Sequence, residues 1–361
     1  MTGGGPGTGA GRPPGEAPAG PGAAEAAAAP LAPGGAAGGT PEGPLRAGRL
    51  RRLAGAALLP VFLLLLALYV RDHAEDFARI LGRPMPPGPP ALLALAVLLA
   101  YWANAEAVRA ALLAHGAAVP RAECLALTLS TSAANTLLPF KGAVALRAWY
   151  LKERHGLALA DFLSQSLAVG LAALSAASLA GLVSLLALRG AEPGAALILE
   201  SYFALALALP AALAASGRLP FRPPGRLGAL WRSWGRYRER PGILLRVALW
   251  DAAFFLLWAL ANRQSLAAFG IALGPAETLF YSAGQIHTLI INLTPAGLGV
   301  TEAWSVFAGQ ILGFTPAEAL LAQGLARLET FLALAVSGLW GWGYLSRLGK
   351  AWGMREGRGK G

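Results

Sequence analysis

Long apolar runs separated by short polar connections occupy most of the chain from about residue 53 onward. A helix needs about 20 mainly apolar residues to cross the hydrocarbon core of a bilayer. Runs near this length predict six transmembrane helices, over about 53–70, 91–112, 158–188, 195–215, 243–263 and 316–345. The pattern therefore predicts an all-α polytopic membrane protein.

Two further apolar segments are each interrupted by Asn, Pro and Gly residues, which do not continue a helix well. The interruptions are Asn135-Thr-Leu-Leu-Pro139-Phe-Lys141-Gly142 and Asn292-Leu-Thr-Pro295-Ala-Gly297-Leu-Gly299. They separate helices over about 122–137 and 142–155, and over about 276–292 and 299–312. Because each half is too short to span a bilayer comfortably, we expect two re-entrant helical hairpins, each entering and leaving on one side.

Irregular backbone at membrane depth persists only where protein or a watery cavity satisfies its polar groups. A related pair of broken segments is also the best sequence pointer to a transport or binding site. The candidate residues at the hairpin breaks are Asn135, Pro139, Asn292, Pro295, Gly297 and Gly299.

The distribution of positive charge sets the expected topology. With the N-terminus in the cytoplasm, the cytoplasmic side receives Arg46–Arg52, Arg121, Lys152, Arg154, eight arginines over 218–246 and the basic C-terminal tail. The exterior receives Arg71, Arg79, Arg83, Arg189 and Arg263. This asymmetry satisfies the positive-inside rule and places both termini in the cytoplasm.

The same count predicts an internal repeat. Each half, about 50–190 and about 195–345, has the order span, span, hairpin, span. Because the second half starts on the opposite side, the halves are inverted, with the first hairpin open to the cytoplasm and the second to the exterior.

Composition supports a membrane protein of bacterial origin. Only 14% of the 361 residues are charged, against about a quarter in a soluble domain. Arginine far outnumbers lysine, and Ala, Gly and Pro are abundant, which suggests a GC-rich bacterial genome and location in the cell (inner or plasma) membrane. The single cysteine, Cys124, excludes an intrachain disulfide, and the four histidines lack metal-ligand spacing.

Four regions flank or interrupt the membrane domain, which we place at 46–347. Residues 1–45 are rich in Gly, Pro and Ala and predict a disordered tail, and 348–361 form a basic tail. The stretch 71–90 predicts a connection, with mixed charges first and non-helical prolines over 84–90. The arginines of 218–246, interspersed with Trp231, Trp234 and Tyr237, predict an amphipathic segment on an anionic membrane surface, not a nucleic-acid site.

Lys141 and Arg147 are the candidate headgroup residues of the first hairpin. The second helix of each hairpin would begin near the membrane centre, where its free N–H groups favour an anion such as phosphate. A charge in the membrane costs at least about 2.5 kcal/mol and usually faces a cavity or a partner. The alternative is that both side chains reach the cytoplasmic interface.

Glu302 and Arg327 are the corresponding candidates in the second half. Glu302 falls in the first turn of a helix, where it could cap free N–H groups or pair with a cation. Arg327 lies midway along the last span and requires a carboxylate, either Glu302 or Glu329. A structural salt bridge and a transport-site arginine both fit.

Other polar residues within the apolar segments have simpler interpretations. Most neutral ones join helices by hydrogen bonds, and these are Gln165, Gln285, His287 and Gln323. We expect Asp161 to cap the third span near its inner end and Asp251 to lie at the membrane interface.

Two motifs resemble a known family. They are Asn135-x3-Pro139-x-Lys141-x5-Arg147-Ala-x2-Leu151 with Gly156-Leu157, and Pro295-Ala-Gly297-Leu-Gly299-x2-Glu302-Ala303. Over about 50–345 the chain resembles the transmembrane region of the lysylphosphatidylglycerol synthase family, also called the flippase-like family. Ala143 and Val144 replace the Gly and acid usual there, and the span 165–178 lacks the family's charges.

The resemblance implies translocation of a lipid or handling of a lipid-linked intermediate, with a phospholipid or polyprenyl-phosphate lipid as partner. The family's soluble aminoacyl-transferase domain is not expected here, and neither is a cofactor, because the sequence contains no P-loop, metal pair or nucleophile with a base. The alternatives are an intramembrane transferase, or an accessory subunit bound to another membrane protein.

Overall fold

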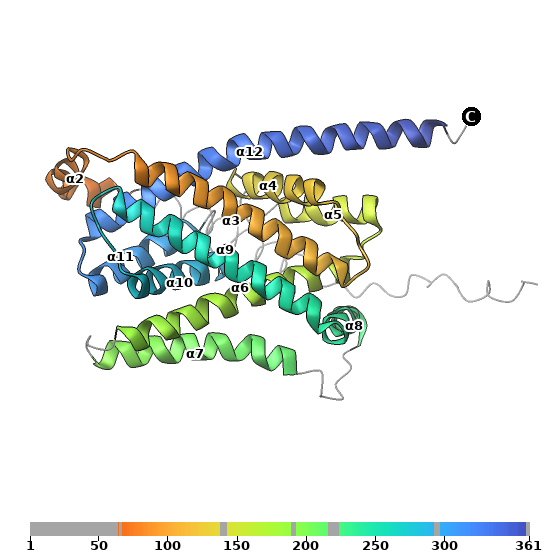
Figure 1. Cartoon of the computed structure of the whole chain (residues 1–361), viewed down its shortest axis with the longest axis horizontal. Helices are drawn as coiled ribbons and strands as arrows, with labels where there is room; N and C mark the ends of the chain where they lie inside the picture. The colour runs from red at the N-terminus through yellow and green to blue at the C-terminus, as the bar shows by residue number, and fades with distance from the viewer. Residues whose placement is uncertain are drawn as a thin grey trace, which may run out of the picture. The chain divides into compact units, whose positions relative to one another are not determined.

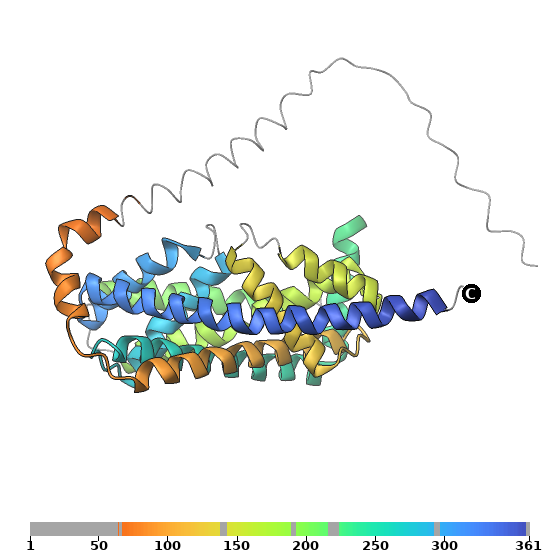
Figure 2. The same ribbon diagram turned by 90° about the horizontal axis from the view of Figure 1, so that it is seen from above.

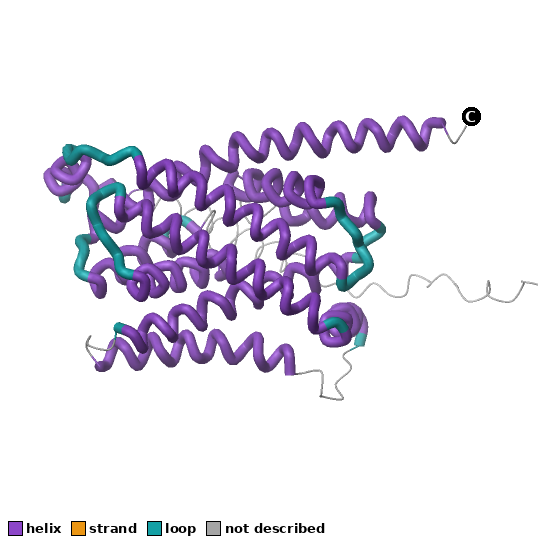
Figure 3. The backbone as a smooth tube through the Cα atoms, viewed as in Figure 1, coloured by secondary structure: helices purple, strands orange, loops and turns teal. Residues whose placement is uncertain are grey.

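The computed structural model describes residues 64, 67–137, 143–188, 193–215, 224–291 and 297–358. These residues contain helices and short loops and no β-strand (Figures 1 and 3). The helices are α2 (Ala74–Leu81), α3 (Gly88–Leu113), α4 (Arg121–Leu137), α5 (Ala143–His155), α6 (Leu159–Ala187), α7 (Pro193–Ala215), α8 (Gly225–Glu239), α9 (Pro241–Ala267), α10 (Pro275–Ile291), α11 (Val300–Leu312) and α12 (Pro316–Arg358). The predicted all-α fold is confirmed.

Five of the six predicted spans lie among the described residues, as α3, α6, α7, α9 and α12. All but α7 are long and apolar enough to cross a membrane, and α7 contains a shorter apolar stretch, Leu197–Leu213. The span predicted over 53–70 and the tail predicted over 1–45 lie largely or wholly outside the described residues. Helix α12 continues through most of the predicted C-terminal tail, to Arg358.

The connection before α3 contains more helix than the sequence predicts. Helix α2 is short and amphipathic, and it buries Phe77 and Ile80. Helix α3 begins at Gly88, so the prediction of a non-helical stretch is wrong at Pro89 and Pro90. Proline is tolerated in a first helical turn because the N–H groups there have no partner within the helix.

The two broken segments approach the middle of the bundle from opposite ends. In Figure 1, α4 and α5 lie in the right half of the bundle, whereas α10 and α11 lie in the left half. The view from above in Figure 2 keeps the two pairs on opposite sides. The breaks themselves, 138–142 and 292–296, lie outside the described residues.

The packing of the first half is repeated in the second. Helix α4 packs on α12 as α10 packs on α6, and α2 packs on α12 as α8 packs on α6. The neighbouring pairs correspond as well: α3–α4 with α9–α10, α4–α5 with α10–α11, and α5–α6 with α11–α12. The pair α3–α9 relates one half to the other. These contacts are those that an inverted repeat of α2–α6 and α8–α12 requires.

Small residues allow the helices to approach closely. Helix α3 is fully buried along an alanine-rich face that includes Ala100, Ala103 and Ala107. On α12, a Cβ atom added to Gly341 would lie 2.6 Å from the carbonyl oxygen of Ala126 on α4. Membrane helices depend on such close packing, because the hydrophobic effect does not favour helix association inside a lipid bilayer.

Candidate functional site

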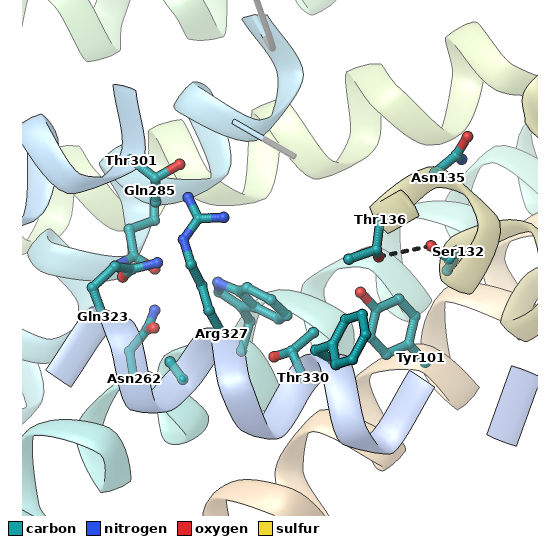
Figure 4. Close-up of a pocket in the computed structure, with 13 residues that line it drawn as sticks. Tyr101, Ser132, Asn135, Thr136, Asn262, Gln285, Thr301, Gln323, Arg327 and Thr330 are labelled. Atoms are coloured by element: carbon teal, nitrogen blue, oxygen red, sulfur yellow. Dashed lines mark hydrogen bonds between the residues drawn. The ribbon is translucent and has the colours of Figure 1, made fainter. Parts of the chain in front are cut away.

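A cavity of about 290 Å³ lies where the two hairpins meet (Figure 4). Six helices contribute to it: α3, α4, α9, α10, α11 and α12. Its lining consists of Tyr101, Ser132, Asn135, Thr136, Trp258, Asn262, Gln285, Thr301, Gln323, Ala326, Arg327, Thr330 and Phe331. We call it the central cavity. Most of these side chains carry a polar group, although the helices that hold them are apolar.

Arg327 projects from α12 into the central cavity between two groups of polar residues. Figure 4 shows Gln285, Thr301 and Gln323 on one side of it, and Thr136 with its α4 neighbours on the other. The guanidinium Nε lies 2.6 Å from Oε1 of Glu302. Of the two carboxylates that the sequence offered to Arg327, the structure therefore selects Glu302.

Glu302 also caps its own helix, so both interpretations of this residue apply. Its second oxygen, Oε2, accepts a hydrogen bond of 2.8 Å from the backbone N–H of Gly299. Gly297 and Gly299 have φ angles of 68° and 88°, a region that strongly favours glycine. Arg327 Nη2 donates to the carbonyl oxygen of Gly297 at 3.4 Å, which ties α12 to the start of α11.

Neutral side chains join the helices around this ion pair. Gln285 Nε2 donates to Gln323 Oε1 at 2.8 Å, and Asn262 Nδ2 donates to Ser282 Oγ at 3.0 Å. His287 Nε2 lies 3.0 Å from Ser178 Oγ. The predicted role of Gln285, Gln323 and His287 as interhelical hydrogen-bonding residues is confirmed.

Asn135 links the two helices of the first hairpin. Its Oδ1 accepts a hydrogen bond of 3.1 Å from the backbone N–H of Ala143, the first residue of α5. The bond satisfies one of the free N–H groups at the start of that helix. Four other candidate residues, Pro139, Lys141, Asn292 and Pro295, lie outside the described residues.

Arg147 lies in a different cavity, of about 360 Å³, between α4, α5 and α12. We call it the lateral cavity. Its lining includes Leu127, Ala134, Leu146, Trp342 and Leu345 and is mainly apolar. Nε and Nη2 of Arg147 are buried and have no hydrogen-bond partner within the described parts of the chain.

Helix α4 separates the two cavities. Ser132 and Thr136 line the central cavity, whereas Thr131 and Ala134 line the lateral one. The structure thus brings Glu302, Arg327 and Asn135 together and places Arg147 apart from them.

A comparison with protein families decides the identity of this membrane domain. The family model described as the lysylphosphatidylglycerol synthase TM region matches residues 52–338. The chain belongs to this family. The matched region is a transmembrane domain and not a catalytic one. No curated protein and no solved structure matches the chain.

Several polar or aromatic residues of this family member were not singled out from its sequence. Tyr101, Trp258, Asn262 and Thr330 line the central cavity. Asn262 could have been recognised from the sequence, because it is an amide inside an apolar span. An aromatic residue or a threonine in such a span is typical of ordinary helix packing and does not indicate a site.

One prediction about acidic residues, that for Asp161, is wrong, and Asp251 has an environment that its sequence position did not indicate. Asp251 lies well inside α9 and is fully buried, and neither of its carboxylate oxygens has a hydrogen-bond partner among the residues described. Its side chain is therefore enclosed by neighbouring helices. Asp161 makes no capping hydrogen bond to its helix. It instead accepts a hydrogen bond of 2.8 Å from Ser233 and lies 3.0 Å from Arg236 Nη1, both on α8.

The Asp161 contacts belong to a polar cluster at the α8 end of the domain. His115, in the loop after α3, lies 3.4 Å from Asp161 and 3.1 Å from the hydroxyl of Tyr237. Burial lowers the pKa of His115 and is the largest cause of the shift. The Asp161 carboxylate raises this pKa, and Arg236 lowers it further. The cluster fixes α8 against the bundle.

Proposed function

We propose that this protein binds the headgroup of an anionic lipid, or of a lipid-linked intermediate, and moves it across the membrane. The observation that carries the proposal is the central cavity, a polar space inside an apolar bundle that is lined by α4 of one hairpin and by α10 and α11 of the other. Polar and charged groups at membrane depth are unfavourable there and mark substrate pathways. The headgroup would occupy the cavity while the acyl chains remain in the bilayer.

The lateral cavity supports a separate step in which the lipid is first bound. Its apolar lining suits an acyl chain, and Arg147 offers guanidinium nitrogens with no partner among the described residues. A guanidinium binds phosphate through two parallel hydrogen bonds. Lys141, near the same break in the sequence, is a further candidate for contact with the phosphate.

The inverted repeat supports a mechanism of alternating access. Helices α4–α5 and α10–α11 are equivalent elements that approach the central cavity from opposite ends of the domain. Movement of one half against the other would open the cavity to each side in turn.

Helix α8 supports a contact with an anionic membrane surface. It exposes Arg226, Arg232, Arg236 and Arg238 and buries Trp234 and Tyr237 against the bundle. Such a helix lies at the interface with its basic face toward anionic headgroups. This fits a bacterial cell membrane with α8 and both termini on the cytoplasmic side.

Reconstitution into liposomes tests the proposal. The purified full chain is incorporated into vesicles with fluorescent phosphatidylglycerol, and the label accessible to an external quencher is followed over time. We expect protein-dependent translocation that falls about tenfold or more in Arg147→Met, because a charge-assisted contact is lost. The matched control is Arg79→Ala, which removes an exposed arginine paired with Asp76 on α2.

Equal rates for the wild-type protein and for protein-free vesicles would reject translocation of this lipid. Equal rates for Arg147→Met and the wild type would reject the assignment of Arg147.

A further inference from the structure

The described residues that line the central cavity are rich in hydrogen-bonding groups but almost free of net charge. Four carboxamides line it, from Asn135, Asn262, Gln285 and Gln323. Five hydroxyl groups line it as well, from Tyr101, Ser132, Thr136, Thr301 and Thr330. Hydroxyl groups both donate and accept, and carboxamides offer a donor and an acceptor side by side.

Among the described residues of this lining, Arg327 is the one cation, and it is already neutralised. Glu302 Oε1 lies 2.6 Å from Arg327 Nε, so the pair contributes no net charge to the cavity. A site that selects phosphate by charge keeps an arginine or lysine free for it. In this domain that description fits the lateral cavity, where Arg147 lies, better than the central one.

The carboxamides of the central cavity are held in fixed orientations. Gln285 is fixed by its bonds to Gln323 and to Ser305, and Asn262 is fixed by Ser282. Side chains held in this way are preorganised and lose little entropy when a ligand binds. The indole Nε1–H of Trp258 has no acceptor among the described residues, although this residue lines the cavity.

Aromatic rings and a small volume complete the description. Tyr101, Trp258 and Phe331 present ring surfaces to the cavity, and such rings pack against apolar C–H faces. The volume of about 290 Å³ is at the lower end of the range for ligand pockets. It suits a headgroup and not a whole lipid.

We propose that the central cavity recognises a headgroup with adjacent hydroxyl groups, such as a sugar ring or a glycerol, through neutral hydrogen bonds and ring contacts. A sugar or polyol combines donors, acceptors and C–H faces in the manner that this lining complements. The phosphate of such a lipid, where it has one, is bound by Arg147 in the earlier step, before the headgroup enters the central cavity. This inference rests on the proposed function, because it names the part of the lipid that the central cavity takes.

Competition between three lipids with identical acyl chains tests it. Glucosyldiacylglycerol has hydroxyl groups and no charge, phosphatidylglycerol has both, and phosphatidic acid has a phosphate and no polyol. The purified full chain with Arg147→Met, in which the lateral cavity no longer offers a guanidinium to phosphate, is incubated with an equimolar mixture, and native mass spectrometry measures which lipids it retains. We expect both hydroxyl-bearing lipids to be retained above phosphatidic acid, and their ratio distinguishes a sugar from a glycerol.

Two tryptophans of α9 provide a matched pair of variants. Trp258→Phe keeps an aromatic ring and removes the buried, unpartnered N–H of a residue that lines the central cavity, whereas Trp250→Phe makes the same change beside Trp102, away from that cavity. Loss of one hydrogen bond reduces affinity about two- to tenfold. We expect this reduction for the hydroxyl-bearing lipids in Trp258→Phe alone, with retention of phosphatidic acid unchanged.

Retention of phosphatidic acid at or above the level of the other two lipids would overturn the inference and leave the proposed function intact. Equal retention by the two tryptophan variants would also overturn it. If none of the three lipids is retained and none is translocated in vesicles, the proposed function fails as well.

Discussion

The two hairpins share one packing scheme but differ in their charges. Helix α4 packs on α12 as α10 packs on α6, yet Glu302 of α11 is bonded to Arg327 and to the Gly299 backbone. Arg147 of α5, in contrast, lines a mainly apolar cavity and has two buried nitrogens without a hydrogen-bond partner among the described residues. A repeated fold therefore does not imply a repeated role. The second hairpin uses its charges to hold structure, and the first contains an arginine with two nitrogens that make no hydrogen bond to a described residue.

The largest effect on stability is expected from breaking the ion pair of the second hairpin. Arg327→Ala leaves the Glu302 carboxylate partly buried without its partner, which costs about 3 kcal/mol or more. The double variant Arg327→Met with Glu302→Gln removes both charges, and Gln at this position preserves the cap on Gly299. We expect it to recover much of the lost stability in thermal unfolding of the purified protein. Equal losses in the single and double variants would show that the pair does not hold the hairpin.

A smaller loss is expected from the glycine at which α12 approaches the first hairpin. Gly341→Ala would place a methyl group 2.6 Å from the carbonyl oxygen of Ala126 and from Ser130 Oγ on α4. Overpacking of this kind costs about 1–3 kcal/mol. Gly343→Ala is the matched control, because an added Cβ there meets no atom within 4 Å. It should be neutral or stabilising by up to about 1 kcal/mol. Thermal unfolding compares the two variants, and equal melting temperatures would contradict the close contact.

Replacement of Arg147 should change stability least among the charges of the hairpins. Arg147→Met keeps the length of the side chain and removes a guanidinium that makes no described hydrogen bond through two of its nitrogens. In lipid-free detergent we expect the free energy of unfolding to change by less than about 1 kcal/mol. A lipid that binds the folded state and not the unfolded state stabilises the protein according to its affinity. Added phosphatidylglycerol should therefore stabilise the wild type more than the variant, which lacks the guanidinium proposed to bind the phosphate. A loss as large as that of Arg327→Ala would mean that Arg147 has a structural role.

The sequence predicts the fold well because the bilayer restricts what a chain can do. Spans follow from apolar length, and the observed membrane helices begin and end close to the predicted residues, except that α12 continues to Arg358. The Arg327–Glu302 pair could also be predicted from the sequence, since a cation in a span requires a partner. The placement of Arg147 and Arg327 in separate cavities could not be predicted. It depends on which face of α4 meets which neighbour, and hence on Ser132 and Thr131 facing different cavities.

The smallest expected effect on stability comes from the polar contacts at the two ends of the domain. At the α8 end, Asp161 contacts the buried His115 and Arg236; at the α2 end, the equivalent contact is Arg83 with Glu318, at 3.8 Å. Because burial holds the pKa of His115 below its usual value of about 6.5, the unfolded chain takes up a proton first as the pH falls. The contribution of His115 to stability is therefore complete above about pH 6.5 and is lost below it, with a slope of at most about 1.4 kcal/mol per pH unit.

His115→Gln removes this titration, so its unfolding free energy should vary less than that of the wild type between about pH 7.5 and pH 5.5. Glu318→Gln, at the opposite end, should leave the difference between these two pH values nearly as it is in the wild type, because the Arg83 side chain of that pair is mostly exposed. Thermal unfolding at both pH values measures each difference. If His115→Gln and the wild type lose the same stability on acidification, the polar cluster at the α8 end is not the source of the pH dependence, and the contrast between the two ends of the repeat is limited to their geometry.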